Sequence, residues 1–181
     1  MTIIAIDQSL NESGYWIDDK ENGIIVTKEA KTQFEKILMI RTKLSILYES
    51  YKYDTLIMEG YSYGSSNTRF TFTAGELGGV LKLFCHDAHI VLYMVPPTIL
   101  KKFICGKGNA KKEQMLLQLY KKTGREFNNN NIADAYALYL FFMSYRQWND
   151  PNLTEIHWTK NEKECFEKFH NIPQEDARQD E

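Results

Sequence analysis

Short apolar runs divide this chain and limit the folds that it can adopt. Runs of this length, bounded by polar residues, are typical of buried strands, and they occupy residues 2–8, 13–18, 23–28, 54–59 and 89–95. Longer stretches carry apolar residues at the spacing of a helix face, and these cover residues 32–51, 70–88, 97–104, 110–123 and 132–148. Strands and helices therefore account for most of the chain.

The order of these elements predicts an α/β fold. Three strands come first, helix and strand then alternate twice, and helices follow. This order is typical of a five-stranded mixed sheet with helices on both faces. The 181 residues fit one domain with an appendage. We place the domain at 1–148 and an acidic C-terminal extension at 149–181, where the periodicity fades, and expect this extension either to be partly disordered or to dock late.

Several classes of protein are not expected. No apolar run approaches the twenty residues or so of a membrane span, and the N-terminus lacks the basic and apolar regions of a signal peptide. Cys85, Cys105 and Cys165 form no CxxC pair, which fits ordinary thiols in a reducing compartment. We expect a cytoplasmic protein that makes no membrane contact.

Charge is distributed unevenly along the chain, although the formal net charge is only −2. Residues 97–125 contain eight basic residues and one acid, whereas residues 149–181 contain nine acids and four bases. A basic segment of this kind favours contact with phosphates, and a solvated helix face is the alternative.

Three acids stand in apolar surroundings. Asp7 and Glu59 each end a predicted strand, and Asp134 lies between two alanines of an apolar helix. Two carboxylates about 4 Å apart repel by roughly 4 kcal/mol at an effective dielectric constant near 20. A cluster of three therefore needs protons or a metal ion, and oxygen ligands without His or Cys point to Mg²⁺ or Mn²⁺.

A plainer interpretation also fits these acids. Asp7 suits a turn, Glu59 an exposed strand end, and Asp134 the start of a helix, where Asp is a common cap. The residues alone leave both interpretations open.

Four stretches resemble the RuvC family of Holliday junction resolvases, in its phage-type branch. They are "IIAIDQSLNESGYWI", "LIMEGYSYGSSN", "TAGELGGVLKLF" with "VPPTILKKFICGKGNAKKEQM", and "NIADAYALYL", in family order from residue 3 to about 145. The resemblance implies an RNase H-like fold and a metal-dependent endonuclease that resolves four-way DNA junctions by paired nicks.

The resemblance also implies a site. Asp7, Glu59 and Asp134 match the acids with which the family binds two metal ions, Mg²⁺ with Mn²⁺ as a substitute. Asn131 stands where the family has an acid or a His, one helical turn before Asp134. It would be a fourth, uncharged ligand, and its neighbour Asn130 is the alternative for this place. Gln8 replaces a common family Pro, from which we expect a different turn and no lost chemistry.

DNA contacts are implied for four lysines. Lys101 and Lys112 match family positions that approach the DNA backbone, and Lys107 and Lys111 extend the same surface.

An aromatic contact with DNA is implied beside the second acid. The family carries an aromatic residue there that stacks on bases near the junction centre. Here the matching position holds Ser62, so the role would pass to Tyr61 or Tyr63. Packing of a tyrosine over the core is the alternative.

A symmetric homodimer is implied as well. The family's dimer interface contains the helix in which this chain has Gly75, Gly78 and Gly79. Since glycine costs about 1 kcal/mol relative to alanine within a helix, a close backbone approach would explain three of them. Plain packing of the helix on the sheet is the alternative.

Other functions remain open on the sequence. A nuclease of the same fold that cuts flaps or forks fits the same residues, and Asn131 makes a non-catalytic junction-binding protein conceivable. "AIDQS" also resembles the start of sugar kinases of the actin-like group, but those need a duplicated domain and a second phosphate loop, for which 181 residues leave no room.

Overall fold

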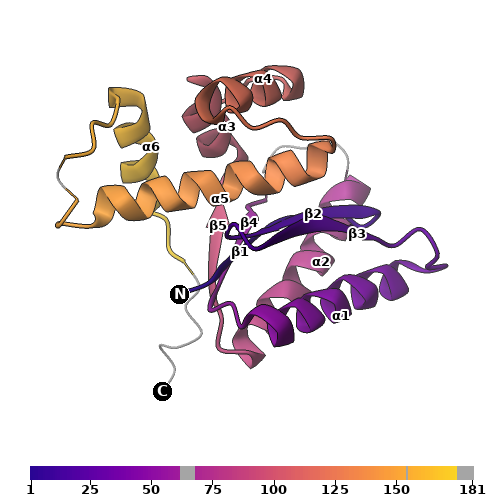
Figure 1. The fold of residues 1–181 in the computed structure, drawn as a ribbon. Helices are drawn as coiled ribbons and strands as arrows, with labels where there is room; N and C mark the ends of the chain where they lie inside the picture. Colours follow the sequence, from indigo (N-terminus) through magenta and orange to yellow (C-terminus); the bar gives the residue numbers. More distant parts are fainter. Residues whose placement is uncertain (62–67, 154, 175–181) are drawn as a thin grey trace.

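The computed structural model describes residues 1–61, 68–153 and 155–174 (Figure 1). A single five-stranded sheet has the strand order β3-β2-β1-β4-β5. Its strands are β1 (Ile3–Asp7), β2 (Glu12–Ile17), β3 (Glu21–Val26), β4 (Thr55–Glu59) and β5 (Val91–Val95). Because β1 pairs antiparallel with β2 and parallel with β4, the sheet is mixed, and the predicted architecture is confirmed.

Helices cover both faces of this sheet. Those within the described residues are α1 (Gln33–Tyr51), α2 (Thr68–Asp87), α3 (Pro97–Cys105), α4 (Lys112–Thr123), α5 (Asn130–Asn149) and α6 (Lys160–His170). Figure 1 shows α1 and α2 on one face and α5 on the other, with α3, α4 and α6 beyond α5. The molecule therefore has an additional helical layer on the α5 side.

Alternation along β1 divides the core into two clusters. Ile4 and Ile6 pack with the helices α1 and α2, whereas Ile3 and Ala5 pack on the side of α5. This is the period-two pattern of a strand that is buried on both faces. Consequently every second residue of β1 faces α5.

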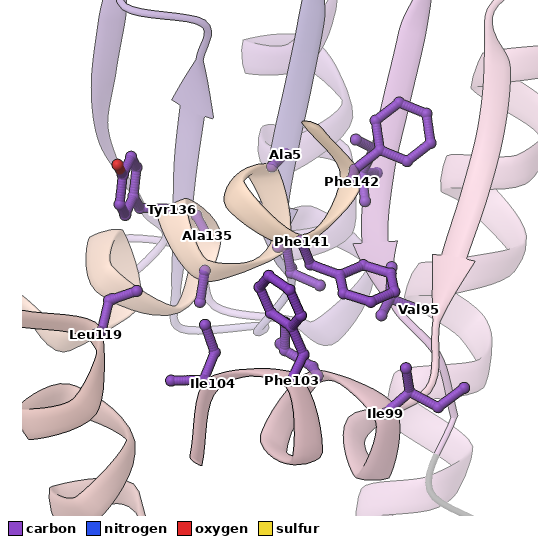
Figure 2. Close-up of a cluster of buried hydrophobic side chains, with 14 of the residues drawn as sticks. Ala5, Val95, Ile99, Phe103, Ile104, Leu119, Ala135, Tyr136, Phe141 and Phe142 are labelled. Atoms are coloured by element: carbon purple, nitrogen blue, oxygen red, sulfur yellow. The ribbon is translucent and has the colours of Figure 1, made fainter. Parts of the chain in front are cut away.

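The layer outside α5 is held by aromatic side chains. In Figure 2, Phe103 of α3 and Phe141 of α5 lie next to each other, with ring centroids 5.2 Å apart. Phe166 of α6 packs 5.7 Å from Phe103, and Phe169 packs 5.1 Å from Phe141. These rings join α3, α5 and α6 into one cluster.

The helix α6 lies within the expected C-terminal extension. Thr159 and Glu162 form a reciprocal capping box that begins it, and Cys165, Phe166 and Phe169 are all at most 1% exposed. In the described part of 149–181, an amphipathic helix is thus buried against the core, because its few apolar residues share one face. The expected disorder falls partly on residues 154 and 175–181, which lie outside the described residues.

None of the helices in the described ranges is both long enough and apolar enough to cross a bilayer.

Truncating Phe166 is expected to lower the free energy of unfolding by about 3–5 kcal/mol, since Phe166→Ala removes a fully buried ring from a packed cluster. Chemical denaturation measures the loss. Leu117→Ala is the control, because Leu117 is 53% exposed and its truncation should change stability by less than about 0.5 kcal/mol. Equal effects of the two substitutions would show that α6 is not part of the core.

Candidate active site

Three acidic side chains line one cavity at the carboxyl ends of β1 and β4. Asp7 ends β1, Glu59 ends β4, and Asp134 lies in the second turn of α5. The cavity has a volume of about 240 Å³ and is lined by Asp7, Glu59, Leu100, Lys101, Lys112, Met115, Asp134 and Leu138. The structure thus brings together the three acids that the sequence singles out and places two lysines beside them.

Strand alternation decides which face these acids occupy. Ile3 and Ala5 of β1 and Ile57 of β4 belong to the cluster on the α5 side. Because alternate strand residues point to the same face, Asp7 and Glu59 follow them toward α5. The pattern that buries the two strands therefore also orients their terminal carboxylates.

Gly14 of β2 lets α5 approach the sheet beside Asp7. Gly14 pairs with Asp7 in the β1–β2 ladder, and a Cβ atom at this position would lie 2.0 Å from the backbone oxygen of Asn131. A side chain here would displace the first turn of α5, and Asp134 with it. Sequence reasoning missed Gly14, although a glycine within a strand pattern can signal a close backbone approach.

Gln8 makes a contact that sequence reasoning missed, because the sequence suggests only a different turn at this position. Its Nε2 donates a hydrogen bond to the backbone oxygen of Glu59 over 2.7 Å, so the side chain links the ends of β1 and β4. Its Oε1 is buried and accepts no hydrogen bond within the part of the chain that the structure describes. Its position next to Asp7 is the signal that could have found it.

Burial and mutual repulsion raise the pKa values of two of the acids. Burial, followed by the charges of Asp134 and Glu59, raises the pKa of Asp7 to about 7, and the charge of Lys112 opposes this rise. Burial and then Asp134 raise the pKa of Glu59, against the charges of Lys101 and Lys112. The cavity is therefore electrostatically suited to a cation.

Lys112, at the start of α4, supplies one positive charge. Its Nζ lies 2.7 Å from Oδ2 of Asp134. Burial lowers the pKa of Lys112, but the hydrogen bond and charge of Asp134, with the charges of Asp7 and Glu59, leave it raised overall. Lys112 therefore stays protonated and neutralises part of the acidic cluster.

The chemistry of the donors fits a divalent metal ion. Carboxylate oxygens are the ligands that Mg²⁺ and Mn²⁺ prefer, and a divalent cation would relieve the repulsion that raises the pKa values of Asp7 and Glu59. Among residues 1–61, 68–153 and 155–174, however, no three His, Cys, Asp or Glu side chains are arranged to hold one ion. The acids share a cavity but do not form a closed ligand set.

Asn131 does not line this cavity. Its Nδ2 donates to the backbone oxygen of Glu12 in β2 over 3.1 Å. Asn129 caps α5, since its Oδ1 accepts from the backbone nitrogens of Asn131 and Ile132. The alternative interpretation of Asp134 as a helix cap is therefore wrong.

The basic segment is less available than its composition indicates. Lys101 and Lys112 line the cavity, and Lys107 and Lys111 are exposed in the connection between α3 and α4. Three other basic residues form ion pairs with acids outside the cavity. The nitrogen–oxygen distances are 2.6 Å for Lys102 with Glu164, 2.5 Å for Lys122 with Glu162, and 3.0 Å for Arg125 with Asp19. Three of the eight basic residues are thus paired with acids outside the cavity, and a fourth, Lys112, is paired with Asp134 inside it.

Tyr61 packs against α2. A Cβ atom at Gly78 would lie 2.0 Å from the Tyr61 hydroxyl oxygen, and Lys82 Nζ lies 5.9 Å from the centre of the Tyr61 ring. This contact explains why position 78 holds a glycine. Tyr63 and Ser62 lie outside the described residues.

Sequence comparisons connect this geometry with known proteins. The family model described as "Crossover junction endodeoxyribonuclease RuvC" matches residues 3–141. A protein of that name from Ehrlichia canis is 30% identical over 148 residues, which cover 77% of this chain and 94% of the relative. Its counterpart from Ehrlichia ruminantium (strain Welgevonden) is 35% identical over 150 residues, covering 76% and 93%.

Solved structures show the same fold. The RuvC structure of Thermus thermophilus is similar with a TM-score of 0.68 at 18% identity, covering 82% of this chain and 97% of the other. The RuvC of that organism in complex with a Holliday junction substrate gives a TM-score of 0.69 at 17% identity, covering 82% and 96%.

Replacing Asp7 by Asn is expected to stabilise the metal-free protein above neutral pH. Folding raises the pKa of Asp7 from 3.8 to about 7, so the folded state binds this proton more tightly than the unfolded state. The group therefore costs increasing stability as the pH rises from about 4 to about 7, by about 1.4 kcal/mol for each pH unit between the two pKa values.

Denaturation of native and Asp7→Asn protein in a metal chelator, at pH 5 and pH 8, measures this effect. The advantage of the variant should be larger at pH 8 by about 2–3 kcal/mol. The same advantage at both pH values would contradict the raised pKa.

Proposed function

Because the chain belongs to the RuvC family of crossover junction endodeoxyribonucleases, we propose that it resolves four-way DNA junctions by nicking two opposed strands. The observation that carries this proposal is the cavity where Asp7, Glu59 and Asp134 meet beside Lys101 and Lys112. It combines ligands for cations with positive charges for a phosphate at the edge of one sheet.

Asp7, Glu59 and Asp134 would hold two Mg²⁺ ions, for which Mn²⁺ can substitute. Such a pair activates a water and stabilises the leaving 3′ oxygen in phosphodiester hydrolysis. The protein supplies the carboxylates on a rigid strand end and helix, and the apolar side chains of Leu100, Met115 and Leu138 line the same cavity. Asn131 remains a proposed fourth ligand, through its Oδ1.

Lysines of α3 and α4 would contact the DNA backbone. Lys101 and Lys112 would lie next to the phosphate that is cut, because they line the cavity of the acids. Lys107 and Lys111 are exposed on the adjoining surface and would contact phosphates further along the strand. Tyr61 and Tyr63 remain proposed contacts to bases near the junction centre.

A homodimer would carry two such cavities to the two strands of a symmetric junction. An apolar groove of about 860 Å³ between α1 and α2 is lined by Thr32, Gln33, Phe34, Ile37, Leu38, Arg41, Glu76, Gly79, Val80 and Leu83. Phe34 is 72% exposed and Leu83 61%. A Cβ atom at Gly75 or Gly79 would meet nothing within 4 Å, so a helix of a second copy has room to approach.

Two narrower assignments also belong to this proposal. The first is that the chain belongs to the phage-type branch of the family. The sequence motifs of this chain support this assignment, whereas the relatives named above are bacterial. A cytoplasmic location suits an enzyme that acts on DNA and has free cysteines.

The first test is cleavage of a synthetic immobile four-way junction in Mg²⁺. The native protein should make paired nicks, and Asp7→Asn should bind the junction but cut it about 10³-fold more slowly, because loss of a metal ligand costs several kcal/mol of transition-state stabilisation. Gel analysis of labelled strands measures the rate.

Asp87→Asn, an exposed acid at the end of α2, is the control and should cut normally. Equal cutting by Asp7→Asn would remove Asp7 from the mechanism. Faster cutting of flaps or forks than of junctions would favour the broader branched-DNA nuclease, and binding without cutting by the native chain would favour the non-catalytic alternative.

The second test concerns the dimer. Native protein at micromolar concentration should be dimeric by light scattering. The double variant with Phe34→Glu and Leu83→Glu should be monomeric, because it would bury two charges in the interface. Leu117→Glu adds a charge to an exposed apolar position of α4 and should remain dimeric. A monomeric native protein would refute the interface.

A further inference from the structure

We propose that Lys112 acts as a substitute cation in the metal-free site, and that its ion pair with Asp134 must open before the acids can bind metal. This inference rests on the proposed function, because it concerns how the same site is loaded. It assigns Lys112 a role in controlling access to Asp134, in addition to its proposed contact with DNA.

The geometry places Lys112 in the position of a competitor. Its Nζ lies 2.7 Å from Oδ2 of Asp134, with the Asp134 side chain 19% exposed and the Lys112 side chain 49% exposed. Both side chains line the cavity that Asp7 and Glu59 also line. An ammonium group at this distance uses part of the acceptor capacity of Oδ2 and places a positive charge beside it, so a metal ion at this oxygen competes with Lys112.

The charges of the cavity explain why Lys112 is held there. Asp7, Glu59 and Asp134 repel one another, and the charge of Lys112 opposes the rise in the pKa of both Asp7 and Glu59. Lys101 lines the same cavity but forms no ion pair with any residue that the structure describes. Lys112 is therefore the cation that is committed to an acid of the site.

This competition accounts for a second observation. The three acids share a cavity, yet within the described parts of the chain no three acidic, His or Cys side chains are arranged around a single point that an ion could occupy. With Asp134 engaged by Lys112, the ligand set is incomplete. Release of Lys112 would free Oδ2 of Asp134 for a cation that the other two acids also bind.

Release of Lys112 would also free an ammonium group for DNA. Its flexible stem of four carbons lets the charge swing away from Asp134, and it starts at the surface that carries Lys107 and Lys111. Binding of a cation to the acids and binding of a phosphate by Lys112 would therefore favour each other, as two ligands do when each relieves the same internal contact.

The alternative is that the ion pair only attaches α4 to α5. An attachment would affect the stability of the fold but not the affinity of the remaining acids for a cation. The two roles therefore differ in metal affinity, which can be measured without DNA and without catalysis.

The experiment is a titration of the full-length, metal-free protein with Mn²⁺ alone, followed by electron paramagnetic resonance of the free ion. Lys112→Met keeps the apolar stem and removes the charge, and it should bind Mn²⁺ about threefold to tenfold more tightly than native protein. Lys111→Met is the matched control, because Lys111 is adjacent, exposed and forms no ion pair with a described residue. Its affinity should equal that of the native chain.

Each outcome decides the proposal. Equal or weaker Mn²⁺ binding by Lys112→Met would overturn the competition and leave the proposed function intact. If no variant binds Mn²⁺ at millimolar concentration, both the competition and the proposed metal dependence fail. Lys112→Arg keeps a cation in the site and covers the case in which Lys112→Met does not fold; tighter binding by Lys112→Arg than by native protein would also overturn the proposal.

Discussion

The contact between the first turn of α5 and the backbone of β2 is the constraint on which the site depends. Gly14 is the residue that permits it, because a Cβ atom there would collide with the backbone of Asn131. Gly14 pairs with Asp7 across the ladder, so the same contact that seats α5 on the sheet also brings Asp134 to the strand-end acids. Because Gly14 has no side chain, the packing of α5 on the sheet also determines where Asp134 lies relative to Asp7.

Much of the fold could be predicted because it depends on local patterns. The apolar runs that become β1 and β4 end in Asp7 and Glu59, and the two strands are parallel neighbours, so their terminal acids lie at one edge. The orientation of Asn131 could not be predicted in this way. It follows from a hydrogen bond to Glu12, 119 residues earlier in the chain, and no periodicity encodes such a contact.

The same limit applies to charge. The basic segment reads as one surface in the sequence, but Lys102 and Lys122 pair with acids of α6 that are 62 and 40 residues away. Lys101 and Lys112, by contrast, line the acidic cavity. Two neighbouring lysines, Lys101 and Lys102, therefore have different partners because a helix that looked like part of a polar tail packs against α3. Only the tertiary structure separates the lysines of the site from those that hold α6.

The position of α6 has a consequence for how a protein of this kind can be shortened. The family match ends at residue 141, before α6, yet Phe166 and Phe169 cover the rings of Phe103 and Phe141. A fragment that ends where the family match ends would expose these rings as a contiguous hydrophobic patch and would be prone to aggregation. In this chain, α6 therefore covers an apolar surface of the part that matches the family.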